Sequence, residues 1–242
     1  RQALYILQRI NKIKNLRGID IVEINAEKDK EKNNLTVKLG AKLLSEIIWV
    51  FIFKEIEINE KMRCFIAIDL PGKVKKDMHR ISKKVETAPF VKGNFVNKQN
   101  LHLTLKFLGE LTSSQIEDVK NNLSDITLGK FECYTGKVGA FPAREYVKTL
   151  WIGLDGDGVM HLKGLIDNKL NSLGVKPDNK EFNSHITLGR VKGIKDKDKF
   201  FELFDKLEMK KTKFPVEKFY LIKSELTREG PKYKVLEEFE LF

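Results

Sequence analysis

Two of the four histidines in this 242-residue chain stand in almost the same sequence phrase. His102 is followed by Leu-Thr-Leu and His185 by Ile-Thr-Leu, so a threonine lies two positions after each. Residues i and i+2 of a β-strand project from the same face, so each histidine would share a face with its threonine. Two such strands side by side would present two imidazoles and two hydroxyls to one site.

These side chains suit acid–base chemistry at an anionic phosphorus centre. Histidine titrates near neutral pH, so one imidazole can accept a proton from water while the other donates one to a leaving oxygen. The hydroxyls of Thr104 and Thr187 can donate hydrogen bonds to non-bridging oxygens, where charge accumulates. Neither phrase contains a carboxylate or thiolate, so we predict a reaction without a metal or other cofactor. Spacing alone treats the two histidines as interchangeable.

Three residues that follow the phrases are candidate substrate contacts. Lys106 and Phe107 come directly after the first phrase, and Arg190 follows the second. The basic pair would add electrostatic attraction for a phosphate, although sequence offsets do not fix which way they face. Two cysteines, Cys64 and Cys133, lie in apolar strand-like surroundings and are interpreted as packed thiols.

Composition narrows the class of protein. A hydrophobic fraction of 41% excludes disorder, and two cysteines are too few for a disulfide scaffold or a zinc cluster. Lys and Arg exceed Asp and Glu by 45 − 34 = 11, which makes a polyanion a reasonable partner. The longest apolar run, residues 47–53, is far shorter than the ~20 residues of a membrane span. We expect a cytoplasmic protein with no membrane segment.

Hydrophobic periodicity from Met62 onward predicts strands that alternate irregularly with helices, as in an α+β domain. The expected strands are 64–68, 101–108, 132–140, 148–154, 185–191, 219–226 and 233–241. The expected helices are 74–85, 113–123, 161–173 and 197–207. Both histidine phrases therefore fall on strands.

From Met62 to the C-terminus the sequence resembles the two-histidine (2H) phosphoesterases, in particular the RNA 2',3'-cyclic phosphodiesterase branch, also known as 2'-5' RNA ligases. The opening strand is similar, as are residues 100–110 and 182–190, which contain the two histidine phrases. The Phe-Pro at 141–142, Leu-Trp-Ile-Gly at 150–153 and the closing segments at 224–226 and 230–233 are similar too.

This resemblance implies a bilobal fold of two pseudo-symmetric lobes, each with an antiparallel sheet and helices, and histidines facing across a central groove. It also implies metal-independent hydrolysis of RNA 2',3'-cyclic phosphate ends to 2'-phosphates. His102 would be the proton donor and His185 the proton acceptor, with Thr104 and Thr187 holding the phosphate. We expect a monomer with no obligate protein partner.

Other functions remain open at this point. The same groups would serve RNA ligation in the reverse direction, or hydrolysis of 2'-5' oligonucleotides or small cyclic nucleotides. The basic excess also fits an RNA or nucleotide binding module that performs little chemistry. Salt-sensitive binding that survives loss of both histidines would distinguish such a module from an enzyme.

Residues 1–61 lie outside that resemblance and are predicted to form a helix–strand–helix extension. Residues 18–25 and 39–43 resemble the C-terminal tail of the ureohydrolases, agmatinase and arginase, and Glu23 would match their guanidinium-binding glutamate. The metal ligands of those enzymes lie upstream of this segment, so we expect the extension to be non-catalytic. Because the chain begins with Arg, we expect it to start mid-protein, with Met62 as the natural start of the phosphoesterase; a gene fusion, a mis-set start codon and an unrelated helical extension remain alternatives.

Overall fold

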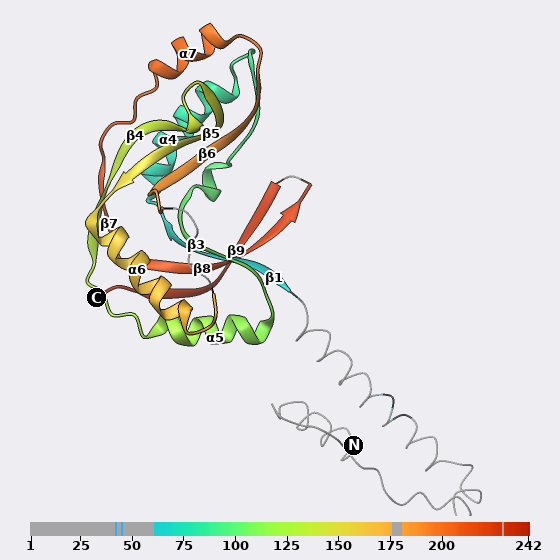
Figure 1. Cartoon of the computed structure of the whole chain (residues 1–242), viewed down its shortest axis with the longest axis vertical. Coiled ribbons are helices and arrows are strands. Elements are labelled where there is room, and N and C mark those ends of the chain that lie inside the picture. Colours follow the sequence, from blue (N-terminus) through green and yellow to red (C-terminus); the bar gives the residue numbers. More distant parts are fainter. Residues whose placement is uncertain (1–41, 43–44, 46–60, 176–180, 229) are drawn as a thin grey trace, which may run out of the picture. The chain divides into compact units, whose positions relative to one another are not determined.

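The chain divides into two units, residues 1–60 and residues 61–242, and both histidine phrases belong to the second. The computed structural model describes residues 42, 45, 61–175, 181–228 and 230–242 (Figure 1). The helix–strand–helix extension expected for residues 1–61 lies outside the described residues, apart from residues 42, 45 and 61.

Two antiparallel sheets organise the second unit (Figure 1). The four-stranded sheet has the order β3-β1-β8-β9, and the five-stranded sheet has the order β2-β6-β5-β4-β7. The strands are β1 (Met62–Asp69), β2 (Val91–Phe95), β3 (His102–Leu111), β4 (Phe131–Ala143), β5 (Tyr146–Asp155), β6 (His185–Ile194), β7 (Lys213–Val216), β8 (Lys218–Thr227) and β9 (Gly230–Glu240). Two sheets with attached helices confirm the α+β class predicted from the sequence.

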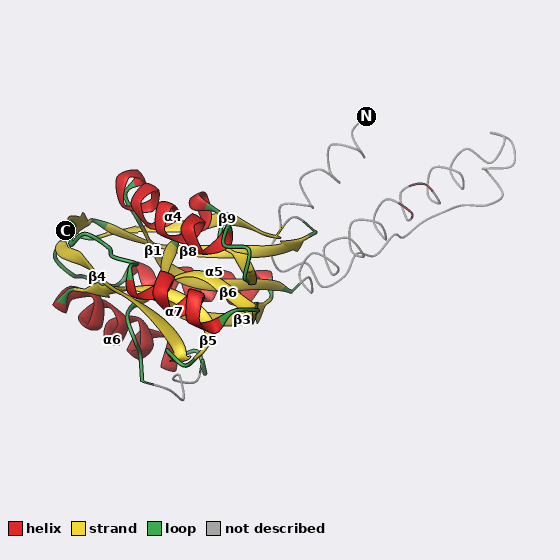
Figure 2. Cartoon of the chain, turned by 90° about the horizontal axis from the view of Figure 1, so that it is seen from above, coloured by secondary structure: helices red, strands yellow, loops and turns green. Residues whose placement is uncertain are grey.

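The helices are α4 (Gly72–Glu86), α5 (Ser113–Ser124), α6 (Asp157–Asn171) and α7 (Lys197–Asp205), with a short 3-10 helix η1 (Lys98–Asn100). Helix α4 follows β1 of the four-stranded sheet but packs on β2 and β6 of the other sheet. Helix α6 follows β5 of the five-stranded sheet and packs on β3 as well as β4. Each of these two helices therefore connects the two sheets. Figure 2 shows α6 on the outer side of the strands.

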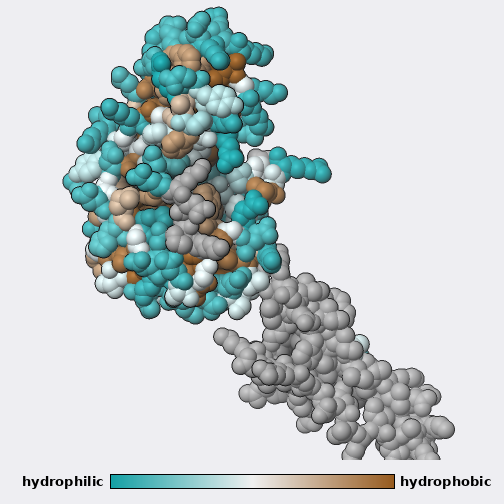
Figure 3. All heavy atoms as spheres, viewed as in Figure 1, coloured by the Kyte–Doolittle hydropathy of each residue, from teal (hydrophilic) through white to brown (hydrophobic). Residues whose placement is uncertain are grey.

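One continuous cluster of buried residues spans both sheets. Ile66 and Leu103 contribute from the four-stranded sheet, and Ile152 and Ile186 from the five-stranded sheet, each with 0% exposure. Strand alternation produces this core, since every second residue of these strands points toward the helices. On the face seen in Figure 3, hydrophilic side chains dominate and apolar ones form separate patches. None of the described helices is long and apolar enough to cross a membrane.

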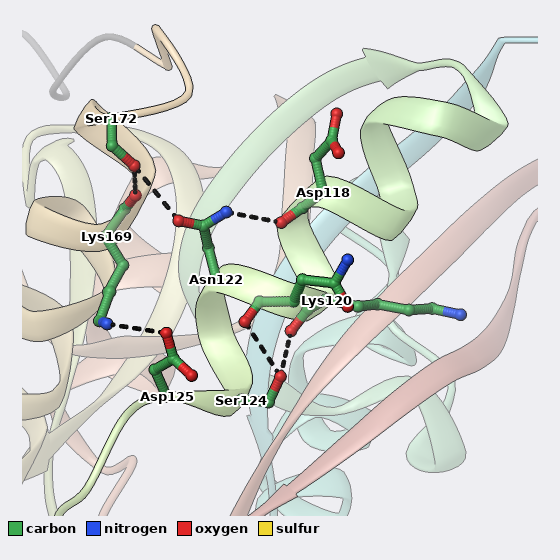
Figure 4. A network of polar contacts seen from close by, with 8 residues as sticks. Asp118, Lys120, Asn122, Ser124, Asp125, Lys169 and Ser172 are labelled. Atoms are coloured by element: carbon green, nitrogen blue, oxygen red, sulfur yellow. Dashed lines mark hydrogen bonds and ion pairs between the residues drawn. The ribbon is translucent and has the colours of Figure 1, made fainter.

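Polar contacts fasten α6 to α5 (Figure 4). Lys169 of α6 donates to the carboxylate of Asp125 at 3.3 Å, and the hydroxyl of Ser172 donates to Asn122 Oδ1 at 3.3 Å. Asn122 in turn donates to the carbonyl of Asp118 at 2.9 Å. Exposed contacts of this kind contribute little stability individually. Together they hold α6 beside α5.

The sequence analysis missed two short strands, β2 and β7, and both lie at the edges of the five-stranded sheet. Strand β2 contains Gly93 and Asn94, which have low β-propensity, and β7 contains Pro215, which cannot donate a ladder hydrogen bond. Edge strands tolerate such residues because only one neighbour must be satisfied. Tertiary pairing, rather than local sequence, forms these strands.

Replacing Leu103 by Ala is expected to destabilise both sheets, because Leu103 belongs to the core that they share. A Leu→Ala change in a core costs about 2–5 kcal/mol. Hydrogen exchange of the whole chain should therefore become faster in β5 and β6 as well as in β1 and β3. The control is Phe107→Ala on the same strand, where the side chain is 70% exposed. Faster exchange confined to the four-stranded sheet would show that the two sheets unfold independently.

Candidate active site

The two histidines occupy equivalent places in the two sheets. His102 is the first residue of β3 and His185 is the first residue of β6. Strands β3 and β6 contact one another, although they belong to different sheets. The structure thus brings together the two strands that carry the repeated phrase.

Both imidazole rings are oriented by the same backbone contact. His102 Nδ1 lies 2.8 Å from the carbonyl oxygen of Asn100, and His185 Nδ1 lies 2.7 Å from the carbonyl oxygen of Asn183. A carbonyl oxygen only accepts hydrogen bonds, so Nδ1 carries the hydrogen in each ring. Nε2 is then the nitrogen of each neutral ring that can accept a proton.

His102 and Thr104 lie on the same face of β3, as strand alternation predicts for the first phrase. His102 Nε2 lies 2.9 Å from Thr104 Oγ1. Because Nε2 of the neutral ring carries no hydrogen, the threonine hydroxyl donates this bond. Thr187 holds the matching position in β6, where it pairs with Trp151 of β5. Each threonine is half-buried and lies two residues after its histidine, as expected.

Each phrase ends in a β-bulge at the same position. In β3, Thr104 pairs with Ala67 of β1 and Lys106 pairs with Ile66, so Leu105 is the extra residue. In β6 the extra residue is Leu188, because the register with β5 shifts at the same place. A bulge reverses the alternation of the residues beyond it. Both phrases therefore contain a bulge three residues after the histidine, which supports the structural equivalence of the two lobes.

The Leu105 bulge corrects one expectation about substrate contacts. Lys106 points away from the histidine face, is 2% exposed and forms an ion pair with Asp167 of α6 at 3.4 Å. It was expected to contact the substrate, but the structure buries it behind the strand. Ordinary alternation would have placed it beside His102 and Thr104, and the extra residue turns it to the opposite face.

The same bulges turn Phe107 and Arg190 to the histidine faces. Phe107 pairs with Phe65 and is 70% exposed, and their ring centroids lie 6.2 Å apart. Arg190 pairs with Thr149 and is exposed. Each of the two follows its histidine by five residues, so they are equivalent positions of the two lobes. Both remain candidates for contact with a substrate.

Aromatic rings flank each histidine. Phe65 stacks on His102 with ring centroids 4.8 Å apart, and Tyr233 meets the edge of the same ring at 5.4 Å. On the other side, Phe141 and Trp151 contact His185 edge-on at 5.0 and 6.0 Å. These side chains come from β1, β9, β4 and β5, so the tertiary fold assembles both surroundings.

Burial lowers the pKa of His102 below its ordinary value of 6.5, because the charged ring is separated from water. The bond to the Asn100 carbonyl and the nearby carboxylate of Asp69 act in the opposite direction, but burial outweighs them. Lys75 adds a smaller lowering effect, and its ammonium lies 2.5 Å from Asp69. His102 is therefore mainly neutral at neutral pH.

Sequence reasoning missed several residues of this site. Asn100 and Asn183 both precede their histidine by two positions, so the repeated phrase is longer than its His-x-Thr-Leu part. That repetition was a signal in the sequence itself. Asp69 lies beside His102 because β1 pairs with β3, and Lys75 of α4 forms an ion pair with Asp69; no local pattern marks either residue.

The two cysteines and any metal-binding cluster are the other features of the described residues that could support chemistry. Burial raises the pKa of Cys64 to about 11 and that of Cys133 to about 12, so neither thiol ionises near neutral pH. Their interpretation as packed thiols is confirmed. The described residues include no group of three or more His, Cys, Asp or Glu side chains placed to hold a metal ion.

Comparison with known proteins gives one family across the second unit. The profile of the "LigT like Phosphoesterase" family matches residues 68–151 and 155–233, whereas that of the arginase family matches residues 1–49. An RNA 2',3'-cyclic phosphodiesterase of Methanocaldococcus jannaschii is 34% identical over 183 residues, which cover 74% of this chain and 100% of the relative. One of Thermotoga maritima is 34% identical over 73% of this chain and 94% of its own. The crystal structure of a Thermus thermophilus protein superposes with a TM-score of 0.61 at 26% identity, over 74% of this chain and 97% of the other.

The proton affinity of His102 can be measured by histidine NMR on the whole protein. We expect its pKa below 6.5 and a hydrogen on Nδ1 in the neutral ring. Phe65→Ala removes the stacked ring and should raise this pKa toward 6.5, because water then reaches the imidazole. Phe201→Ala, a comparable truncation on α7, should leave the titration unchanged. A pKa at or above 6.5 in the unaltered protein would contradict this account.

Proposed function

Because this chain belongs to the LigT-like phosphoesterase family, we propose that it hydrolyses 2',3'-cyclic phosphodiester ends of RNA to 2'-phosphomonoesters. The observation that carries this proposal is the matched pair of histidines on two contacting strands, each ring held by the same Nδ1 contact. Relatives named RNA 2',3'-cyclic phosphodiesterase match this chain along nearly their whole length. The family resemblance expected from the sequence is thereby confirmed.

The reaction divides between the two imidazoles. His185 accepts a proton at Nε2 from the attacking water, whose oxygen forms a new bond to phosphorus. His102 donates a proton from Nε2 to the 3' oxygen as the phosphorus–O3' bond breaks, which leaves the phosphate on the 2' oxygen. The hydroxyls of Thr104 and Thr187 donate to the non-bridging oxygens, where charge increases. Proton donor and acceptor are assigned from the family resemblance.

The substrate itself supplies the charge that His102 needs. A proton donor must be protonated, while burial lowers the pKa of His102 in the free protein. A phosphodiester anion beside the ring favours the imidazolium and raises the pKa again. Thr104, which donates to Nε2 in the free protein, would then turn its hydroxyl toward the phosphate. Substrate binding would thus prepare the acid for the reaction.

Arg190 and Phe107 would extend this site. Arg190 is exposed on the histidine face of β6, and its guanidinium can donate two hydrogen bonds to phosphate oxygens. Phe107 is exposed on the histidine face of β3, where an RNA base could stack on it. The net charge of +11 adds long-range attraction for RNA.

The alternative reactions use the same groups. Ligation of RNA ends to a 2'-5' linkage is the reverse of cleavage, and 2'-5' oligonucleotides or small cyclic nucleotides present a similar phosphodiester. We propose hydrolysis of RNA ends as the main activity because that is the activity in the names of the most similar curated relatives. A binding module without chemistry would not need two histidines with identically oriented rings.

We propose that residues 62–242 act as a monomer in the cytoplasm, since one chain supplies both motifs and both cysteines are unpaired. Residues 1–61 would be a non-catalytic extension derived from a ureohydrolase tail, in keeping with the arginase match at residues 1–49.

Activity should depend on both histidines and on no metal. Incubated with a short RNA that ends in a 2',3'-cyclic phosphate, the protein should release a 2'-phosphate end, identified by chromatography, with EDTA present. His102→Ala and His185→Ala should each lower kcat by about 10²–10⁴-fold, because each removes one proton transfer and its positioning. His161→Ala, outside the two phrases, is the control. Full activity in either active-site variant would reject the mechanism, and binding without turnover in the unaltered protein would favour the binding module.

Arg190→Met should raise KM and lower kcat/KM by about 10–100-fold, because it removes charge-assisted hydrogen bonds to the phosphate. Lys192→Met, two residues further along β6, removes the same charge from another exposed side chain and is the matched control. Steady-state kinetics at two salt concentrations separates direct contact from long-range attraction. Equal effects of the two substitutions would assign Arg190 to long-range attraction only.

A further inference from the structure

Helix α6 touches the strand of the first histidine through a buried ion pair. Lys106 follows the Leu105 bulge of β3 and is 2% exposed. Its ammonium lies 3.4 Å from Asp167 Oδ1, on α6. Lys106 therefore links the strand that contains His102 and Thr104 to helix α6.

The same carboxylate binds a second buried lysine. Lys163, one helical turn before Asp167 on α6, is 5% exposed and pairs with Asp167 Oδ2. Residues i and i+4 of a helix lie on one face, so Asp167 stands between Lys163 and Lys106. Two buried lysines thus share the carboxylate of Asp167, whose side chain is 25% exposed, and removal of any member leaves a charge with less compensation.

Lys163 also contacts the segment that precedes the strand of the second histidine. Its ammonium lies 5.6 Å from the ring centroid of Phe182, at a distance typical of a cation–π contact. Phe182 is half-buried and stands three residues before His185, directly before Asn183, whose carbonyl orients the His185 ring. One face of α6 therefore contacts residues four positions after His102 and three positions before His185.

We propose that the cluster Lys106–Asp167–Lys163, together with Phe182, sets the relative position of the two histidines. Its members are positioning residues, because none lies on the histidine faces. The inference rests on the proposed function and adds which residues hold the two histidine motifs in a fixed position relative to each other. Proton transfer from one imidazole and to the other requires both within hydrogen-bond reach of one phosphate, and a displacement of 1 Å can cost about 100-fold in rate.

A buried ionic cluster suits this task better than it suits stability. Desolvation of buried charges offsets most of their attraction, so such clusters contribute little net stability. Their geometry is nevertheless specific, since each ammonium must meet the carboxylate to be compensated. The contacts of α6 with α5 provide a fixed base, through Lys169 and Ser172 (Figure 4). The cluster can therefore transmit the position of α6 to β3 and to the segment that precedes β6.

A double-mutant cycle in the whole chain tests this. Lys106→Met removes the contact with β3, and Phe182→Leu removes the contact with the His185 segment. Each should lower kcat about 10-fold or more with little change in KM. If both act through α6, the double variant should lose no more than the worse single variant, whereas independent effects would multiply.

Two controls separate positioning from stability. Ile166→Val lies in the core face of the same helix and lowers stability without touching the cluster, and Met160→Ala removes an exposed side chain of α6. Both should keep kcat at a temperature well below each variant's Tm. A kcat that follows Tm across all variants, or multiplicative losses in the cycle, would overturn the proposal. Lack of turnover in the unaltered protein would instead reject the proposed function.

Discussion

The placement of the reacting groups depends on one apolar core that two sheets share. Leu103 and Ile186 point into this core from the positions next to His102 and His185. Because neighbouring residues of a strand face opposite sides, burying the aliphatic residue forces the histidine to the other face. Helices α4 and α6, which cross between the sheets, close the core and bring β3 and β6 into contact.

The core determines which face of each strand the histidine occupies, and backbone geometry then determines how its ring is oriented. The carbonyls of Asn100 and Asn183 select the same tautomer in both rings, so each histidine presents Nε2 for proton transfer. The bulges at Leu105 and Leu188 return later residues to the histidine faces, and the carbonyl of Leu188 accepts from Val96 at 2.8 Å. The same local backbone geometry is thus repeated around the histidine of each lobe.

The two solutions differ in their surroundings, and this difference has chemical consequences. Phe65 stacks on the face of His102, Tyr233 meets its edge, and burial lowers the pKa of this histidine. No stacked ring is found at His185 among the described residues, where Phe141 and Trp151 both meet the ring edge-on. The two similar phrases therefore lie in different environments. The family resemblance supplied the roles of donor and acceptor, and the aromatic side chains that distinguish the two rings come from other strands.

The sequence alone determined the class of fold and the strands that carry the two histidines, and it predicted these as the reacting groups, because strand alternation and the His-x-Thr repeat are local properties. It also indicated the family of the second unit and the arginase-like character of the first. Only the tertiary structure showed that Lys106 is buried behind β3, because the bulge that turns it there depends on pairing with β1. Pairing likewise created the edge strands β2 and β7 and placed Asp69 beside His102. Contacts between distant segments follow from packing in three dimensions, which no window of neighbouring residues records.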